Sequence, residues 1–391
     1  MSPARADELK DEEAAVYDRQ LRVWGVEVQR KLTAARVLLV GFGKVAAEAP
    51  KNITLAGVGH VTLLDDTPAA QLAGHNFLVT PAAAGEHTAA QAAAATLQAM
   101  NPLVKVSAAA GPAAAAAASA DDLAGQDLVI ATGAMPLGQL QQLNAAARRA
   151  GASFMAGGAS GPGGWFFVDL RQHSYVPKGS AGADSDKVTL QYSALAEVLA
   201  PPAAPLPATT HAMYHVLLVC AALEQQLQRP LTAADLPAAQ QQLQQLAAAS
   251  PQLAAAQQQL AAHLAGAAEF APVAAVLGGI IANNVVAAVS GSGAPLNNML
   301  FYSLLDGRAI VETQPAGDGA GGIIANGVVD AVSGSGAPLN NMLYYSLLDG
   351  RAIVETQPTG VGAGGAAQPG KAAAGSQQQQ QQQQAEEVVI D

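Results

Sequence analysis

Cys220 is the only cysteine among the 391 residues. A single thiol excludes both an intramolecular disulfide framework and a cysteine-rich zinc site. A lack of disulfides is typical of proteins in reducing compartments. Cys220 lies within the apolar run Val216–Leu223, and apolar surroundings raise the pKa of a thiol and make it unreactive. We therefore interpret Cys220 as a core residue and not as a nucleophile.

Aromatic residues make up only 4% of the chain, and the 19 Lys and Arg residues are outnumbered by 30 Asp and Glu. The formal net charge of −11 argues against a nucleic-acid-binding surface, which needs clustered cations. Half of the residues are apolar, but many are alanines, which bury little area each. Gly, Pro or polar residues interrupt every apolar stretch before about 18 positions, so we expect no membrane-spanning helix.

Helical and strand patterns alternate over residues 17–174, after an acidic segment, 1–16, that we expect to be a flexible lead-in and not a signal peptide. This alternation predicts an α/β domain with a Rossmann-like, mainly parallel sheet and helices on both faces. The predicted strands are 36–40, 61–64, 104–107, 128–131 and 165–170, and the predicted helices are 17–33, a stretch ending at 56, 88–100 and 137–150.

A mostly helical insertion, rich in Ala and Gln, is predicted over 175–270, and 271–315 returns to the α/β domain. The segment Gly278–Pro315 then recurs 43 residues later as Gly321–Pro358, with three differences in 38 positions. Each copy predicts a helix, a turn and a strand pair, which in the first copy are 280–289, 299–304 and 309–312. Two near-identical copies are too few for a solenoid, so we favour a recent duplication or an error in the gene model. We expect the two copies to compete for one place in the sheet, with the other copy outside the fold.

The remaining segment, 359–391, is a tail rich in Gly, Ala and Gln, and this composition predicts disorder. Its end, Glu386–Asp391, is an acidic and β-branched run that is similar to a SUMO-interacting motif. Because such runs are short and common, we favour a disordered end over a binding segment.

Gly41-Phe42-Gly43 follows the strand 36–40 and precedes a helix, as in turns that bring backbone N–H groups to a phosphate. Asp65 ends the next strand, where an acid can accept hydrogen bonds from a ribose. Two interpretations of Gly41, Gly43 and Asp65 stay open: a dinucleotide site, as in an NAD-dependent oxidoreductase, and a tight turn that binds nothing. His211 and His215 lack a third ligand nearby in sequence, so we predict no metal site.

The segment Tyr17–Gly25 (YDRQLRVWG) is a more specific signal. It is similar to the N-terminal signature of the ubiquitin-like-modifier activating enzymes, the ThiF/MoeB-like family. The resemblance covers residues 13–315, loosely in the middle. The other segments that resemble the family follow in its order: Arg36–Gly43, Lys51–Gly59, Leu63–Asp66, Asn76–Leu78, Asn101-Pro102, Glu269–Val273 and Gly278–Ile280.

In this family two related α/β halves pair, and one half binds ATP and Mg²⁺ to adenylate the modifier before a catalytic cysteine takes it as a thioester. This chain resembles the degenerate half. Its segment Gly74-His75-Asn76 and the helix start near Thr88 lack the family's phosphate-binding cations, and Ala131–Met135 lacks the magnesium-binding Asp. Without those charges phosphoryl chemistry has no electrostatic stabilisation. The resemblance implies that the partner binds ATP and Mg²⁺, while Gly41, Gly43 and Asp65 survive as structure.

Arg19 is the one functional residue that the resemblance carries over. In the family this Arg reaches across the dimer to the partner's ATP phosphates, like an arginine finger in trans. The small, non-catalytic subunit of the SUMO-activating enzyme is the most similar type, which implies a catalytic SUMO-activating subunit and SUMO as partners. The same resemblance implies that the protein resides in the nucleus, with some of it in the cytoplasm.

Three alternatives remain beside this interpretation. The chain could serve another ubiquitin-like modifier, or it could be an NAD-dependent oxidoreductase that uses Gly41, Gly43 and Asp65. The oxidoreductase hypothesis leaves Tyr17–Gly25 unexplained. A self-contained adenylating homodimer is disfavoured by the missing Lys, Arg and Asp.

Overall fold

The structure is a computed structural model. It describes residues 11–81, 85, 87–109, 111, 121–132, 135–176, 187–248, 250–266, 268–292, 294–305 and 307–315, and the backbone of 341–345 and 352–356. The chain divides into two units, residues 1–338 and 339–391, and each is described by itself. The predicted lead-in before residue 11 and the predicted tail, 359–391, lie outside the described residues.

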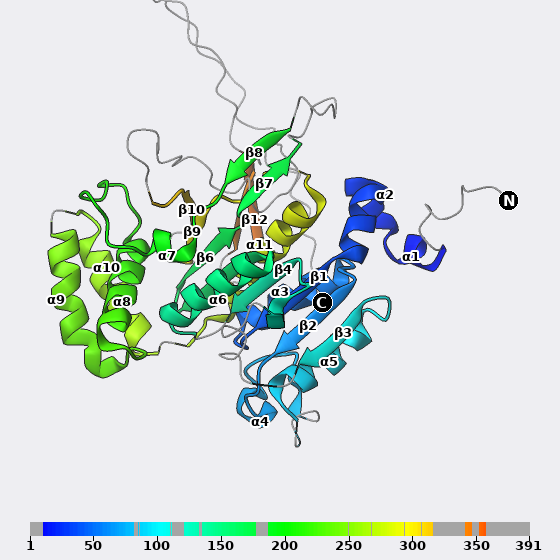
Figure 1. Cartoon of the computed structure of the whole chain (residues 1–391), viewed down its shortest axis with the longest axis horizontal. Helices are drawn as coiled ribbons and strands as arrows, with labels where there is room; N and C mark the ends of the chain where they lie inside the picture. Colours follow the sequence, from blue (N-terminus) through cyan, green and yellow to red (C-terminus); the bar gives the residue numbers. More distant parts are fainter. Residues whose placement is uncertain are drawn as a thin grey trace, which may run out of the picture. The chain divides into compact units, whose positions relative to one another are not determined.

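Eight strands of the first unit form one sheet in the order β10-β9-β6-β5-β4-β1-β2-β3 (Figure 1). The pairs β3–β2, β2–β1, β1–β4 and β4–β5 are parallel, and β6, β9 and β10 continue the sheet with antiparallel pairs. The strands are β1 (Arg36–Val40), β2 (His60–Leu64), β3 (Lys105–Ala109), β4 (Leu128–Thr132), β5 (Ser153–Ser160), β6 (Gly163–Asp169), β9 (Met299–Ser303) and β10 (Arg308–Glu312).

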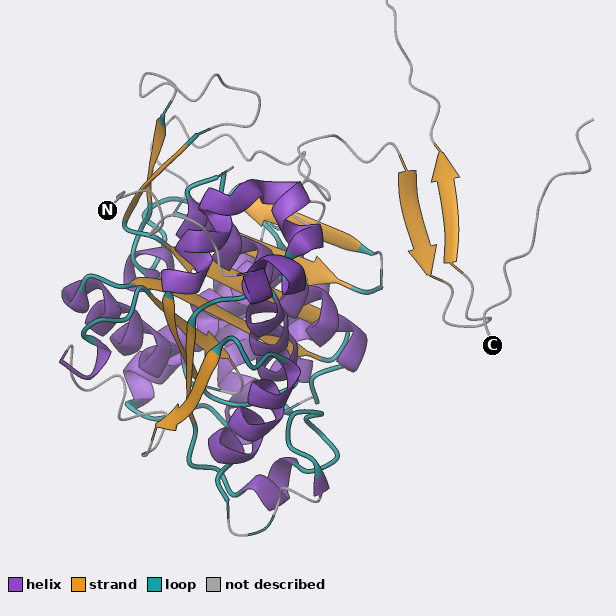
Figure 2. Cartoon of the chain, turned by 90° about the vertical axis from the view of Figure 1, so that its right-hand side faces the viewer, coloured by secondary structure: helices purple, strands orange, loops and turns teal. Residues whose placement is uncertain are grey.

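The central strands are apolar throughout because helices cover both faces of the sheet. In β1, Val37 and Leu39 pack into one hydrophobic core, whereas Leu38 and Val40 pack into a second core on the other face. Helices α2, α3, α5 and α11 contribute to the first core, and α6 and α8 contribute to the second. Figure 2 shows the strands between these helical layers. The prediction of a Rossmann-like sheet with helices on both faces is confirmed.

The helices of the first unit alternate with the strands and then form a cluster over 195–264. They are α1 (Asp11–Val16), α2 (Asp18–Ala34), α3 (Val45–Leu55), α4 (Ala69–Leu72), α5 (Ala89–Met100), α6 (Leu137–Ala150), α7 (Leu195–Val198), α8 (Ala212–Leu227), α9 (Leu236–Ala247), α10 (Leu253–Leu264) and α11 (Ala271–Ser290), with short 3-10 turns at Asp121–Leu123 and Ala233–Asp235. Helix α8 packs against α9 and α10. A separate two-stranded sheet, β7 (Gln172–Tyr175) and β8 (Val188–Gln191), was not predicted.

Helix α11 begins at Ala271, nine residues before the predicted start at Ile280. The sequence prediction began the helix with the repeat, but Pro272 stands in the first turn, where proline is well tolerated. Helix α11 has 20 residues, and an 18-residue window within it has a mean hydropathy of 1.9, so it is long and apolar enough to cross a membrane. Its apolar side chains, such as Leu277 and Ile281, are instead buried against α3 and the sheet, as in the core helix of a globular domain.

The two copies of the repeat have different places in the described structure. The strand pair of the first copy, β9 and β10, extends the central sheet beside β6. The strand pair of the second copy, β11 (Asn341–Tyr345) and β12 (Ala352–Thr356), forms a two-stranded sheet of its own in the second unit. The domain boundaries drawn from the sequence stay predictions.

A buried carboxylate, Asp169, joins β6 to α6. It accepts hydrogen bonds from Asn144 Nδ2 at 2.7 Å, from Arg148 Nε at 2.6 Å and from the backbone N–H of Arg171 at 2.9 Å. Asp169 is only 1% exposed, so its charge depends on these partners.

We predict that Asp169→Ala lowers the free energy of unfolding by about 3 kcal/mol, because Arg148 and the buried Asn144 amide lose their common acceptor. Urea unfolding followed by circular dichroism measures this change. The matched control is Asp18→Ala, which removes the exposed ion pair with Arg22 and should change stability by less than about 1 kcal/mol. Equal effects of the two substitutions would contradict the role given to Asp169.

Candidate functional site

The candidate site lies at the carboxyl edge of the parallel strands, between β1 and β4. Chain order reverses there, and such switch points are where open α/β sheets bind ligands. Helix α3 begins after β1 through the turn Gly41–Lys44, and α6 begins after β4. Gly41 has φ of +84°, and a Cβ at this residue would collide with the carbonyl oxygen of Thr132. The turn therefore requires glycine at Gly41 whether or not a ligand binds.

The carboxylate of Glu269 occupies the N-terminus of α3. It accepts hydrogen bonds from the backbone N–H groups of Lys44 and Val45, and it fills the space that a Cβ on Gly43 would take. Burial raises the pKa of the Glu269 carboxyl above its usual value, and these N–H groups oppose that shift. A helix N-terminus is the position where a nucleotide phosphate would bind. Here the chain's own carboxylate takes that position.

A second carboxylate, that of Glu224, caps the neighbouring helix α6. Glu224 Oε2 accepts a hydrogen bond from the backbone N–H of Gly138 at 2.8 Å, and Leu137 donates another to this carboxylate. Burial raises the pKa of the Glu224 carboxyl, and the two N–H groups again oppose the shift. Both helices that begin beside the switch point thus carry an internal anion at their positive ends.

The other residues around the turn are also bonded within the chain. Asp65, which is buried, accepts a hydrogen bond from the backbone N–H of Thr67 at 2.7 Å. Asn76 donates from Nδ2 to the carbonyl oxygen of Gly43 at 2.8 Å and accepts from the N–H of Leu78 at 3.0 Å. The structure thus brings Gly41, Gly43 and Asp65 to one edge, and it gives each a role in holding that edge.

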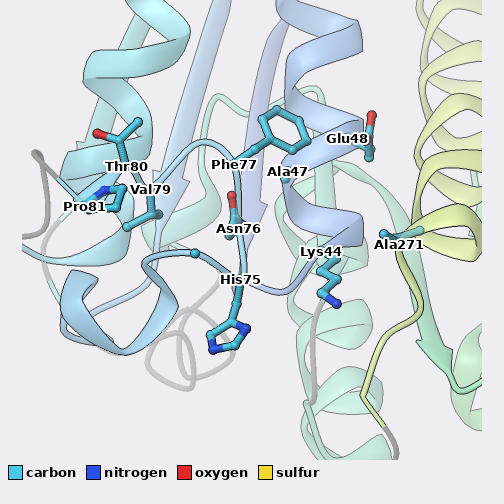
Figure 3. A pocket seen from close by; sticks show the side chains of 12 residues that line it. Lys44, Ala47, Glu48, His75, Asn76, Phe77, Val79, Thr80, Pro81 and Ala271 are labelled. Carbon is cyan, nitrogen blue, oxygen red and sulfur yellow. The ribbon is translucent and has the colours of Figure 1, made fainter.

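A cavity of about 440 Å³ adjoins this edge between α3, the loop 74–81 and the start of α11 (Figure 3). Lys44 and His75 lie at one end of it, and Phe77 and Glu48 lie toward the other. Glu48 is paired with Lys51 at 2.5 Å, and the Lys51 ammonium lies 5.3 Å from the Phe77 ring centroid. Among the described residues no group of three His, Cys, Asp or Glu could hold a metal ion.

Arg19 lies far from the switch point, at the other end of α3. Its neighbour Gln20 donates from Nε2 to the carbonyl oxygen of Leu55, the last residue of α3, at 3.1 Å. Because α3 has 11 residues, its two ends lie about 16 Å apart. Arg19 is exposed and makes no hydrogen bond or ion pair with the described part of the chain. The structure therefore separates Arg19 from Gly41, Gly43 and Asp65.

Exposed valines flank Arg19 on the helical segments before the kink at Gly25. Val16, the last residue of α1, is 61% exposed. Val23, four residues after Arg19 and on the same side of α2, is 80% exposed.

The residues His211, His215 and Cys220 have structural roles. The His211 ring is stacked on Phe301 with centroids 4.8 Å apart, and its Nδ1 accepts from the N–H of Met213. His215 is buried, which lowers its pKa. Cys220 is 1% exposed, and burial raises the pKa of its thiol to about 12, which confirms its interpretation as a core residue.

Comparisons with known proteins identify the family of the chain. A family model described as the ThiF family matches residues 17–318. SUMO-activating enzyme subunit 1A of Arabidopsis thaliana is 32% identical over 317 residues, which cover 78% of this chain and 97% of that protein. SUMO-activating enzyme subunit 1 of Danio rerio is 42% identical over 100 residues, 26% of this chain and 29% of that protein. Among solved structures, the crystal structure of PaaA has 15% identity and a TM-score of 0.48, and covers 80% of this chain and 76% of that one.

Sequence reasoning missed the caps made by Glu269 and Glu224. The segment that contains Glu269 was noted only for its family resemblance, although its position just before a helix with Pro272 at its start was visible. Glu224 lies 86 residues from Gly138, and no local pattern connects the two.

We predict that Glu269→Ala lowers the free energy of unfolding by about 1–3 kcal/mol, because the N–H groups of Lys44 and Val45 lose their acceptor. The variant should also gain a phosphate-dependent rise in melting temperature that the unsubstituted chain lacks, since an anion can then reach the helix end. Differential scanning fluorimetry with and without inorganic phosphate measures both effects. Glu27→Ala, which removes an exposed acid on α2, should show no phosphate dependence. A response to phosphate in the unsubstituted chain would contradict the assignment.

Proposed function

Because the chain belongs to the ThiF family, we propose that it is the non-catalytic subunit of a heterodimeric SUMO-activating enzyme. In this role it supports ATP-dependent adenylation and thioester formation of SUMO by a catalytic partner, as part of protein sumoylation. The similarity to a SUMO-activating enzyme subunit 1A over 97% of that protein's length supports the choice of modifier. A subunit for another ubiquitin-like modifier is the alternative within the family.

One observation carries the non-catalytic part of the proposal: the two helix N-termini beside the switch point hold Glu269 and Glu224. A nucleotide phosphate would have to displace a carboxylate from each of those positions. The phosphate charge would also meet the buried Glu269 carboxylate there, and the nearby Lys44 already interacts with that carboxylate. The chain alone is therefore expected to bind neither ATP nor Mg²⁺, which the catalytic partner would hold.

The position of Arg19 supports its action on another chain. It lies at the end of α3 opposite the chain's own switch point, exposed and without a partner among the described residues. A guanidinium keeps its charge at all physiological pH values and presents several donors to phosphate oxygens. In the heterodimer, Arg19 would neutralise charge on the ATP bound by the partner, while Val16 and Val23 beside it would be covered by the partner.

The same geometry weighs against the oxidoreductase alternative. An NAD pyrophosphate would need the N–H groups at the start of α3, and Glu269 accepts hydrogen bonds from two of them. No observation on the described residues favours a hydride-transfer site. Residence in the nucleus, with some in the cytoplasm, remains a proposal that rests on the family resemblance alone.

We predict that ATP–pyrophosphate exchange with SUMO requires both this chain and a SUMO-type catalytic subunit. Arg19→Ala should lower the exchange rate at least about 100-fold without changing the melting temperature, because a cation contacting the reacting phosphates contributes of order 10³-fold or more to such rates. Arg30→Ala, an exposed arginine further along α2, is the matched control and should leave the rate unchanged.

Three results of this assay would contradict the proposal. Exchange by this chain alone would show a working nucleotide site. An equal loss in Arg19→Ala and Arg30→Ala would remove the special role of Arg19. An absence of exchange with any SUMO-type partner would favour another modifier or another function.

A further inference from the structure

The strand pair of the first repeat copy is held in the central sheet by a small set of buried groups. Asn298 and Gln314 are joined by two hydrogen bonds, from Asn298 Nδ2 to the Gln314 carbonyl oxygen and from the Gln314 N–H to Asn298 Oδ1. Glu312 accepts the N–H of His211 at 2.7 Å and the side-chain amide of Gln314 at 3.1 Å. Phe301, fully buried, is stacked on His211. These contacts join β9 and β10 to each other and to the start of α8.

The second copy carries the same groups 43 residues later. Asn341, Glu355 and Gln357 correspond to Asn298, Glu312 and Gln314, and the segment 337–358 differs from 294–315 only at Tyr344, which replaces Phe301. The backbone of the second copy also repeats the pairing of the first. Met342 is opposite Glu355 in β11–β12, as Met299 is opposite Glu312 in β9–β10.

Two of the three sequence differences concern α11, where the residues of the first copy fit better, and the third lies in the strand pair itself. Asn284, replaced by Gly327, is buried, and its side chain accepts the N–H of Leu296 at 2.8 Å to fix the turn before β9. Ala287, replaced by Asp330, is only partly exposed on α11, where a carboxylate would lose hydration. Phe301 leaves no exposed surface, so the hydroxyl of a tyrosine there would be removed from water.

We propose that the second strand pair, residues 341–356, is an alternative occupant of the place beside β6 that β9 and β10 hold here, within the same chain. Helix α11 stays in place during this exchange, because its buried Val273 and Leu277 precede the repeat and have no counterpart in the second copy. The chain from Ser290 would then reach the sheet through 51 residues instead of eight. The entropy of closing a loop grows only with the logarithm of its length, so the longer connection disfavours the exchanged form without excluding it.

The proposal predicts that a minor fraction of the molecules has the second strand pair in the sheet. The size of this fraction depends largely on the hydroxyl group of Tyr344. In the exchanged form the phenol of Tyr344 stands where Phe301 stacks on His211, and it must lose water or find a new hydrogen-bond partner. In a chain with Phe301→Tyr and Tyr344→Phe, the free-energy cost of removing the phenol hydroxyl from water falls on the first copy instead. The exchanged population should then rise at least about tenfold.

A disulfide trap in the full-length chain tests the proposal. Residues directly opposite in an antiparallel pair have Cα atoms within disulfide range, and Gly163 in β6 is opposite Ser303 in β9. A Cβ at Gly163 would meet no heavy atom closer than 3.7 Å, so cysteine fits there. Gly163→Cys with Ser303→Cys reports the form seen here, and Gly163→Cys with Ser346→Cys reports the exchanged form. Buried Cys220 does not compete.

The expected result is a disulfide between positions 163 and 346 that forms within monomers at low protein concentration. This disulfide should form at least about ten times faster than the disulfide in a control chain with Gly163→Cys and Ser376→Cys. The control measures how often the tail meets position 163 by random encounter. Addition of Phe301→Tyr and Tyr344→Phe should raise the trapped fraction, in a glutathione redox buffer, by about tenfold. Peptide mapping identifies the bridge. The trap at 163 and 303 shows that the variants fold.

Three results would overturn the proposal. One is a rate for the 163–346 bridge no higher than that of the tail control. The second is a trapped fraction that does not respond to the Phe301 and Tyr344 swap. The third is a 163–346 bridge found only in dimers, which would mean exchange between chains and not within one.

Discussion

The hydrogen bonds between the Glu269 carboxylate and the first N–H groups of α3 determine what this fold can do. They join the segment before α11 to the turn after β1, two parts of the chain that lie 225 residues apart. The contact satisfies a helix end that would otherwise lack partners, and it places a negative charge where a nucleotide phosphate would need to be. The sheet edge is therefore stable without a ligand and unfavourable to an anionic one.

This constraint gives the two ends of α3 different roles. At its N-terminus, Glu269 caps the helix and Asn76 donates to the carbonyl oxygen of Gly43. Asp65, at the end of β2, accepts the N–H of Thr67. Its C-terminus packs beside the segment that carries Arg19, and there the surface is open, with exposed apolar side chains and a cation without a partner among the described residues. In the proposed function, this ThiF-family domain leaves the nucleotide chemistry to its partner and presents a cation to that partner from the second surface.

The sequence predicted the elements with local signals well. The strand 36–40 and the helix 137–150 have the predicted bounds, because an apolar run and a helical period ended by glycine identify them directly. It missed β5, since Gly157 and Gly158 in its centre are unfavourable for an isolated strand. A Cβ at Gly157 would lie 3.1 Å from the Trp165 carbonyl oxygen, so close packing of β6 requires the small residue. Such a requirement depends on tertiary contacts.

The candidate site shows the same division. Gly41, Gly43 and Asp65 were identified from their local spacing. Arg19 was named from family resemblance, and its role stays a prediction. The caps Glu269 and Glu224 were not found, because each meets its helix end only after the chain has folded, across 225 and 86 residues.

The most direct test of the account is calorimetric titration of the isolated, full-length chain with ATP and Mg²⁺. The account predicts no heat of binding at ATP concentrations up to about 1 mM, since the binding energy must first displace buried carboxylates from both helix ends. Micromolar binding by the isolated chain would contradict it, and would show that the edge beside β1 and β4 is a working nucleotide site.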